Sequence, residues 1–220
     1  MFYVAFLAVM VLGAIVQWNL NRKFRKYSKV AAPLTGAQVA ETMLKQNGIY
    51  DVSVTSIKGT LTDHYDPAKK TINLSGDVYS QRSIAAAAVA AHETGHAIQH
   101  AKGYAPLKLR SAMVPVVSFA NSAVSIVLVI GVILVEVLPS ILWIGIGLFA
   151  LTTLFSFVTL PVEIDASARA IAWLKDSRLA SDETLPKAVD ALKWAAYTYV
   201  IAALGSLITL LYYIGIARSK

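Results

Sequence analysis

The chain contains no cysteine, and it has few charged residues for its length. Without cysteine, disulfide bonds, thiolate catalysis and cysteine-ligated metal sites are all excluded. Only 15% of the 220 residues are charged, whereas an average soluble domain has about 25%. Hydrophobic residues make up 56% of the chain. This composition excludes intrinsic disorder, which requires low hydrophobicity and high charge, and it argues against an ordinary cytosolic globular protein.

Charge is missing altogether from four long stretches of the chain. Each is long enough to cross a bilayer, since about 20 apolar residues span roughly 30 Å of hydrocarbon. The stretches are Phe2–Leu20, Ser111–Val135, Val137–Val162 and Trp194–Ala217. We expect four transmembrane helices, of which the second and third form a tight hairpin around Glu136 and Pro139. The first stretch lacks the flanking features of a signal peptide, so we expect a retained anchor.

The basic residues are distributed unevenly over the segments between these stretches. Thirteen of the 20 Lys and Arg residues lie in 21–110, five lie in 161–193, and none lies in the hairpin corner. Because Lys and Arg are enriched on the cytoplasmic side, we predict that both segments face the cytoplasm and that both termini lie outside. The net charge of +7 indicates topology and contact with the lipid bilayer. No nucleic-acid partner is expected, because no recognition motif accompanies the basic residues.

The segment between the first two spans predicts a small α+β domain. Thr35 is a suitable N-cap for an amphipathic helix that ends near Gln46. Strands are predicted near 52–57, 60–65 and 71–74, and an alanine-rich helix over about 81–102. The predicted fold class is an α-helical membrane protein with four transmembrane helices and a small cytoplasmic α+β domain. Its segments are a first helix (1–20), the domain (21–110), a transmembrane hairpin (111–162), a cytoplasmic segment (163–193) and a last helix (194–217).

The alanine-rich helix carries the motif His92-Glu93-Thr94-Gly95-His96. Two histidines four residues apart lie on one helical face, about 6 Å apart along the axis. Both imidazoles can therefore bind one Zn²⁺ at about 2.0–2.1 Å. Glu93 follows the first histidine and is placed to accept a proton from a water molecule that the zinc activates. The alternative is a solvated helix with incidental histidines, but half of the chain's four histidines lie in this motif.

A catalytic zinc site needs a third protein ligand and one open position. The candidates are His64, His100 and Glu163. On a straight helix His100 lies about 12 Å from His92 along the axis, too far for one zinc ion, so we expect it at the surface or beside a ligand. Glu163 is favoured, because the hairpin returns the chain to the side of the membrane that holds the motif. The alternative for Glu163 is a solvated helix end.

Three strings of residues carry a family resemblance that extends beyond the motif. They are Leu61–Pro67, Ala90–Gln99 and Pro161–Ala170. With them the chain resembles the YugP-type neutral zinc metallopeptidases of bacteria over nearly its whole length, and more distantly the HtpX and CaaX-protease membrane peptidases.

The resemblance implies a zincin-like domain in a multi-pass protein of the bacterial inner membrane, with its active site facing the cytoplasm. It implies a gluzincin site in which His92, His96 and Glu163 hold the zinc and Glu93 is the general base. The distant relatives carry an aspartate four residues after the glutamate ligand, where this chain has Ser167. We therefore expect Asp165 and Ser167 to contact the zinc ligands without binding the zinc themselves.

Peptide hydrolysis also requires that the substrate backbone be held. In related peptidases, a strand that precedes the motif helix pairs with extended substrate. Asp63, His64 and Tyr65 occupy that place here and are the predicted substrate-binding residues. The alternative is a purely structural strand.

The oxyanion of a tetrahedral intermediate needs a hydrogen-bond donor. The candidates are Arg169, Tyr197, Tyr199 and His64, of which Arg169 and Tyr199 are the predicted catalytic donors. For the tyrosines the alternative is an anchoring role at the membrane interface. For Arg169 it is pairing with Asp165 or with lipid.

These features predict a zinc metalloendopeptidase that cleaves protein or peptide substrates at the cytoplasmic membrane surface. An intramembrane protease is disfavoured, because the apolar run of the motif helix is too short to span a bilayer. A zinc transporter is disfavoured, because all four histidines lie outside the spans. The remaining alternative is a catalytically silent zinc-binding scaffold or regulator, against which the presence of Glu93 argues.

Overall fold

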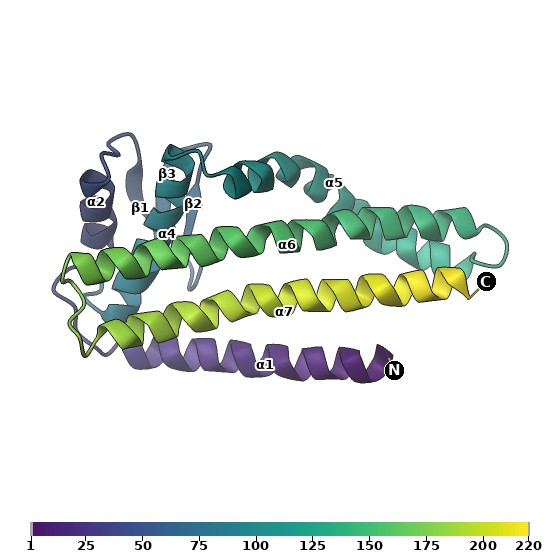
Figure 1. Cartoon of the computed structure of the whole chain (residues 1–220), viewed down its shortest axis with the longest axis horizontal. Coiled ribbons are helices and arrows are strands. Elements are labelled where there is room, and N and C mark those ends of the chain that lie inside the picture. The colour runs from purple at the N-terminus through teal and green to yellow at the C-terminus, as the bar shows by residue number, and fades with distance from the viewer. Residues whose placement is uncertain (1, 220) are drawn as a thin grey trace. The chain divides into compact units, whose positions relative to one another are not determined.

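The computed structural model describes residues 2–219 (Figure 1). The chain divides into two compact units. The first contains residues 2–15, 108–161 and 198–219, and the second contains Val16–Leu107 and Val162–Tyr197.

Four long apolar helices supply the first unit. They are α1 (Phe2–Tyr27), α5 (Ala105–Ile133), α6 (Pro139–Asp176) and α7 (Leu185–Arg218). Each contains an 18-residue window with a mean hydropathy between 1.8 and 2.4, which is long and apolar enough to cross a membrane. Large apolar side chains such as Val4, Leu7 and Ile126 are exposed. Because soluble proteins rarely expose so much apolar surface, these helices are suited to contact with lipid.

Helices α5 and α6 follow each other closely along the chain. The first helix ends at Ile133 and the second begins at Pro139. Gly131 allows the two helices to approach closely, since a Cβ atom there would lie only 2.6 Å from the Cα atom of Leu142. Around this contact, Leu128 and Ile146 are buried in the core of the first unit. A glycine therefore sets the separation of the two hairpin helices.

A methyl group at this contact should destabilise the first unit. In Gly131→Ala the new Cβ meets backbone atoms that cannot rotate away, and overpacking of this kind costs about 1–3 kcal/mol. Gly147→Ala is the matched control, because a Cβ there meets no atom within 4 Å. We expect a lower thermal unfolding midpoint in detergent for Gly131→Ala and no decrease for Gly147→Ala. Equal midpoints for the two variants would contradict the close approach.

The second unit contains the short helices and the sheet. Its elements are α2 (Gly36–Gln46), β1 (Ser53–Ile57), β2 (His64–Asp66), β3 (Thr71–Ser75), α3 (Gly76–Ser80) and α4 (Ile84–Ala101). The strand order is β1-β3-β2, with β1 parallel and β2 antiparallel to β3. One edge of β2 is therefore unpaired within this sheet. Helix α2 begins with the predicted N-cap, Thr35, which forms a capping box with Gln38.

Several boundaries differ from those expected from the sequence. Strand β2 is shorter than predicted, because the chain before it turns through Gly59 and Leu61, both at positive φ. Helix α4 starts at Ile84 and not near Gln81, since the side chain of Ser83 caps it by accepting from the backbone N–H of Ala86. Helix α3 was not expected.

Helix α6 also extends further than predicted. The charge-free stretch ends at Val162, but the helix includes Pro161 and continues to Asp176. A proline inside a helix removes one backbone hydrogen bond, and α6 accommodates this loss. Glu163 and the residues after it are consequently held on a regular helix and not in a loop.

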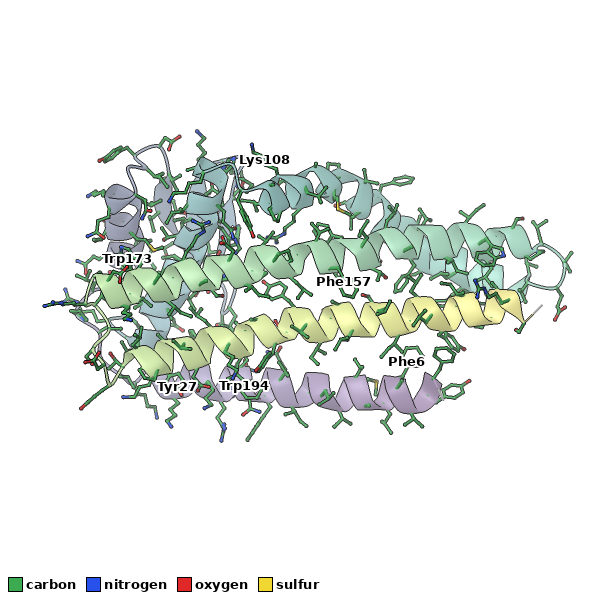
Figure 2. All side chains as sticks on the ribbon, in the orientation of Figure 1. Phe6, Tyr27, Lys108, Phe157, Trp173 and Trp194 are labelled. Carbon is green, nitrogen blue, oxygen red and sulfur yellow. The ribbon has the colours of Figure 1, made fainter. Side chains whose placement is uncertain are left out.

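Helix α4 lies at the centre of the second unit (Figure 1). Its alanine-rich first turns are buried among α2, the sheet and the later part of α6. Polar contacts join the outer elements: Trp173 of α6 donates to the side chain of Gln46 on α2 at 2.6 Å, and Tyr27 of α1 donates to Asp190 of α7. Figure 2 labels Tyr27 and Trp173. The motif helix is thus enclosed on several sides.

Candidate metal centre

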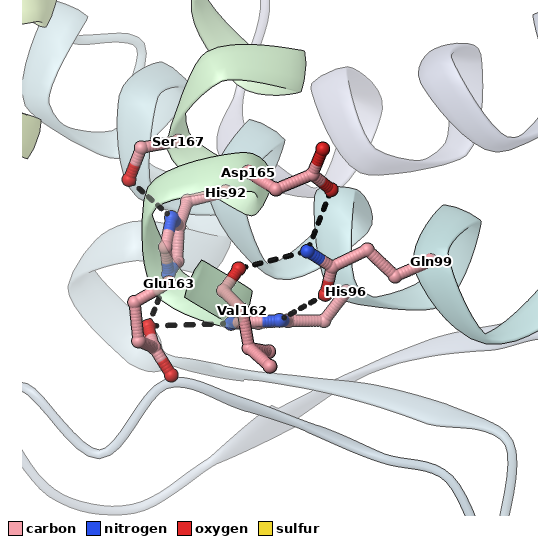
Figure 3. A network of polar contacts seen from close by, with 7 residues as sticks. All are labelled: His92, His96, Gln99, Val162, Glu163, Asp165 and Ser167. Carbon is pink, nitrogen blue, oxygen red and sulfur yellow. Dashed lines mark hydrogen bonds and ion pairs between the residues drawn. The ribbon is translucent and has the colours of Figure 1, made fainter. Parts of the chain in front are cut away.

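Three side chains with metal-binding atoms meet between α4 and α6 in the second unit (Figure 3). The Oε2 atom of Glu163 lies 3.2 Å from Nε2 of His92 and 3.5 Å from Nε2 of His96. One ligand atom from each residue lies within 4.8 Å of the others, and this is the one such cluster among the described residues. Ligands about 2.0–2.1 Å from a tetrahedral zinc are separated by roughly 3.3 Å. The donor set and its spacing therefore fit a zinc ion.

A close approach of the two helices brings Glu163 to the histidines. Gly95 lies between them on α4, and a Cβ atom there would be 2.7 Å from the backbone oxygen of Ala166 on α6. Glu163 is only 2% exposed, and burying a carboxylate is costly unless it has partners. The two imidazoles are those partners. The glycine of the motif is thus needed for the packing that brings the three ligand atoms together.

Hydrogen bonds on the far side of each ring fix which nitrogen is free to bind metal. The Nδ1 atom of His96 lies 3.0 Å from Oε1 of Gln99. Because an amide oxygen only accepts, Nδ1 of His96 carries a proton, and Nε2 is the nitrogen left for binding a metal. Ser167 lies 3.0 Å from Nδ1 of His92, where it accepts from the ring once Nε2 is a ligand. Partners of this kind orient metal-binding histidines and raise their basicity.

Gln99 was not singled out in the sequence, although it connects most of the site. It is completely buried, and its Nε2 donates at 2.8 Å to the backbone oxygen of Val162 and at 2.8 Å to Asp165. Both partners are acceptors, so the orientation of the amide is unambiguous. Arg169 in turn donates to Asp165 at 2.6 Å. A continuous series of hydrogen bonds runs from His96 through Gln99 and Asp165 to Arg169.

The electrostatic environment of the cluster favours a cation. Burial by itself favours the neutral ring of His96, but the hydrogen bond to Glu163 and the charges of Glu93 and Glu163 hold the pKa of His96 above its ordinary value. Glu93 is 8% exposed, and among the described residues its carboxylate has no hydrogen-bond or ion-pair partner. A nearly buried acid without a protein partner is therefore available beside the cluster.

The residues predicted to bind substrate lie on and just before β2. Asp63 accepts hydrogen bonds from the backbone N–H and the hydroxyl of Ser75, which fixes the start of β2 against the end of β3. The ring of His64 contacts the Thr62 carbonyl oxygen through Nδ1. Neither His64 nor His100 belongs to the metal-binding cluster.

Tyr65 links β2 to α4. Its hydroxyl lies 2.8 Å from Nδ1 of His100, which is exposed one turn beyond the motif. Burial is the main cause that raises the pKa of Tyr65 to about 12, so the phenol stays protonated at neutral pH. The hydroxyl and the ring are thus joined by a hydrogen bond, and His100 lies at the surface.

The predicted oxyanion donors have different surroundings. Arg169 forms an ion pair with Asp165 and lies 5.9 Å from the ring centroid of Tyr104. Tyr197 stacks edge-on against Trp194 of its own helix. Tyr199 belongs to the first unit. The pairing of Arg169 with Asp165, which is the alternative to an oxyanion contact, is the arrangement present in the structure.

Two histidines one helical turn apart, a distant carboxylate and an acid beside them, in a chain with four membrane-length apolar helices, are typical of a class of protein, the zinc-binding membrane proteins. Comparison with known proteins narrows this class. The family model described as "putative neutral zinc metallopeptidase" matches residues 2–218, so the chain belongs to that family. Its cofactor is zinc.

One curated relative is similar over nearly the whole length of both chains. It is a protein of Bacillus subtilis (strain 168) named "Putative membrane protease YugP", which is 41% identical over 213 residues, 95% of this chain and 94% of the relative. No solved structure matches the chain.

A larger separation of α4 and α6 at Gly95 should reduce zinc binding at the site. Gly95→Ala places a methyl group against the α6 backbone, so the helices must separate and Glu163 moves away from the histidines. We expect zinc per protein, measured by atomic emission on purified protein, to fall below half of the wild-type value. Gly76→Ala is the control, since a Cβ there meets nothing within 4 Å, and it should keep full occupancy. Full zinc content in Gly95→Ala would contradict the packing argument.

Removing the amide of Gln99 should weaken zinc binding without removing a ligand. Gln99→Met keeps the volume but loses all three hydrogen bonds, and loss of such supporting partners typically costs about 10–100-fold in metal affinity. The measurement is competition with a fluorescent zinc chelator. The circular dichroism spectrum of the metal-free variant should match the wild type, which shows that the fold survives. Unchanged affinity in a folded variant would exclude a positioning role for Gln99.

Proposed function

We propose that this chain is a membrane-anchored zinc endopeptidase that hydrolyses peptide bonds of protein substrates at the cytoplasmic membrane surface. His92, His96 and Glu163 are the proposed zinc ligands, and Glu93 is the proposed general base. The observation that carries this proposal is the meeting of three ligand atoms beside a partner-free carboxylate. Membership of a zinc metallopeptidase family and similarity to a membrane protease support it.

In such a reaction, different residues of the chain have different roles. When bound, zinc supplies a Lewis acid that polarises a carbonyl group and makes water acidic near neutral pH. Glu93 accepts the proton of the attacking water and then gives it to the leaving amine. Its carboxylate is free to do so, because no described side chain holds it. Ser167 and Gln99 keep His92 and His96 in the tautomer that presents Nε2.

The unpaired edge of β2 is the proposed place for the substrate backbone. Its free N–H and C=O groups can extend the sheet by one strand, a common way to bind an extended peptide. Strand β2 contacts α4 through the Tyr65–His100 hydrogen bond, and Asp63 fixes its start. In this proposal Asp63 and Tyr65 hold the strand in position, and His64 lies beside the bound peptide.

Stabilisation of the oxyanion is proposed for Arg169 or Tyr199. The ion pair with Asp165 favours a positioning role for Arg169, since two nitrogen atoms of its guanidinium donate to that carboxylate.

The proposed cytoplasmic location of the site rests on the basic residues. Of the 20 Lys and Arg residues, 18 lie in 21–110, between the first two apolar stretches, and in 161–193, before the last one.

Substitution of the proposed base tests catalysis separately from metal binding. Glu93→Gln keeps the three ligands, so it should retain zinc at the wild-type ratio. Loss of general acid–base catalysis should slow cleavage of fluorescently labelled casein about 10²–10⁴-fold. Glu41→Gln, an exposed acid on α2, is the matched control and should cleave at the wild-type rate.

The same assay distinguishes a zinc peptidase from a catalytically silent zinc-binding scaffold. A zinc-loaded wild-type protein that cleaves neither casein nor a mixture of unfolded proteins would favour the scaffold. A Glu93→Gln variant that cleaves at the wild-type rate would leave the zinc peptidase class standing but would exclude Glu93 as the base.

A further inference from the structure

One concave feature of the second unit lies outside the metal centre and carries many basic residues. It is a cavity of about 760 Å³ between the end of α1 with its following turn on one side and the β1–β2 loop with α3 on the other. The first wall carries the cations Arg22, Arg25, Lys26 and Lys29. The opposite wall carries Thr60, Asp77 and Gln81. We call this feature the basic cavity.

The cations of the basic cavity lack carboxylate partners. All four are exposed, and none forms an ion pair with another described residue. On the same helix, Lys23 behaves differently, since it pairs with Asp190 at 2.6 Å. Four positive charges face one carboxylate, that of Asp77. Such an excess repels itself and creates a potential that attracts an anion.

Neighbouring residues indicate what kind of anion reaches this cavity. Trp18, one turn before Arg22, is 60% exposed, and the guanidinium of Arg22 lies 4.7 Å from its ring centroid. An exposed tryptophan followed by basic residues is typical of the boundary between hydrocarbon and headgroups. The apolar stretch Phe2–Leu20 ends two residues before Arg22. Lipid phosphates lie just outside the hydrocarbon, at the level where the cations begin.

We propose that the basic cavity binds the phosphodiester of an anionic glycerophospholipid. The four cations of α1 and its turn surround the phosphate oxygens. Thr60 and Gln81 offer uncharged donors from the opposite wall, and Asp77 accepts from a hydroxyl group of the headgroup. This arrangement selects phosphatidylglycerol over a zwitterionic lipid. It also differs from the diffuse attraction of basic segments to a membrane, because uncharged side chains take part.

Binding of a short-chain lipid to the full chain tests the proposal. The protein is purified in a neutral detergent, and native mass spectrometry follows the titration of dioctanoyl phosphatidylglycerol, dioctanoyl phosphatidylcholine and inorganic phosphate. We expect one saturable site for phosphatidylglycerol that the other two probes do not fill at the same concentration. Arg25→Gln/Lys26→Gln should weaken this site at least tenfold.

Two further variants distinguish a specific binding site from attraction by the net charge of the protein. Lys45→Gln/Lys175→Gln removes the same charge at exposed positions outside the cavity and should change the affinity less than twofold. Gln81→Ala removes no charge and should weaken binding several-fold. All substituted side chains are exposed, so the lipid-free melting temperatures should equal that of the wild type.

Three outcomes would overturn the proposal. Equal losses in the two double variants would mean diffuse attraction by net charge. Saturation by inorganic phosphate at the concentration that phosphatidylglycerol needs would mean a site for small anions and not for lipid. Wild-type affinity in both Arg25→Gln/Lys26→Gln and Gln81→Ala would place the lipid elsewhere.

Discussion

The close approach of α4 and α6 at Gly95 is the constraint on which the candidate site depends. The two histidines are neighbours on one helix whatever the rest of the chain does, but Glu163 comes from 67 residues beyond His96 in the sequence. Only a glycine lets the backbone of Ala166 lie where a Cβ would otherwise be. The buried amide of Gln99 then joins the two helices at the same level. The packing of α4 against α6 therefore also determines the geometry of the three candidate ligands.

The sequence predicts the local part of the site and the apolar helices well, because both depend on spacing within single helices. The histidine pair follows from a separation of four residues, and the four apolar helices follow from the absence of charge. The hairpin supplied a topological reason to favour Glu163 over His64 and His100. The structure brings Glu163, and neither of the other two, to the histidine pair.

What the sequence does not predict depends on contacts between elements. Gln99 lies three residues after His96, which is one helical turn, so a search for supporting side chains on the same face would have found it. Its contacts with Val162 and Asp165 could not be foreseen, because they depend on α6 continuing past Pro161. A proline after a long apolar run normally marks the end of a helix. Here the packing of α6 against α4 outweighs that local preference.

The surroundings of Glu93 favour a catalytic over a silent role. A structural zinc site normally has four protein ligands, whereas a catalytic site has three and an open position. Among the described residues three ligand atoms converge, and the fourth nearby group is an acid without a partner. No buried side-chain oxygen or nitrogen of the described residues lacks a hydrogen-bond partner, so the partner-free carboxylate of Glu93 is accessible to solvent at the site. A solvent-accessible acid beside three ligand atoms is the arrangement that the proposed general base requires.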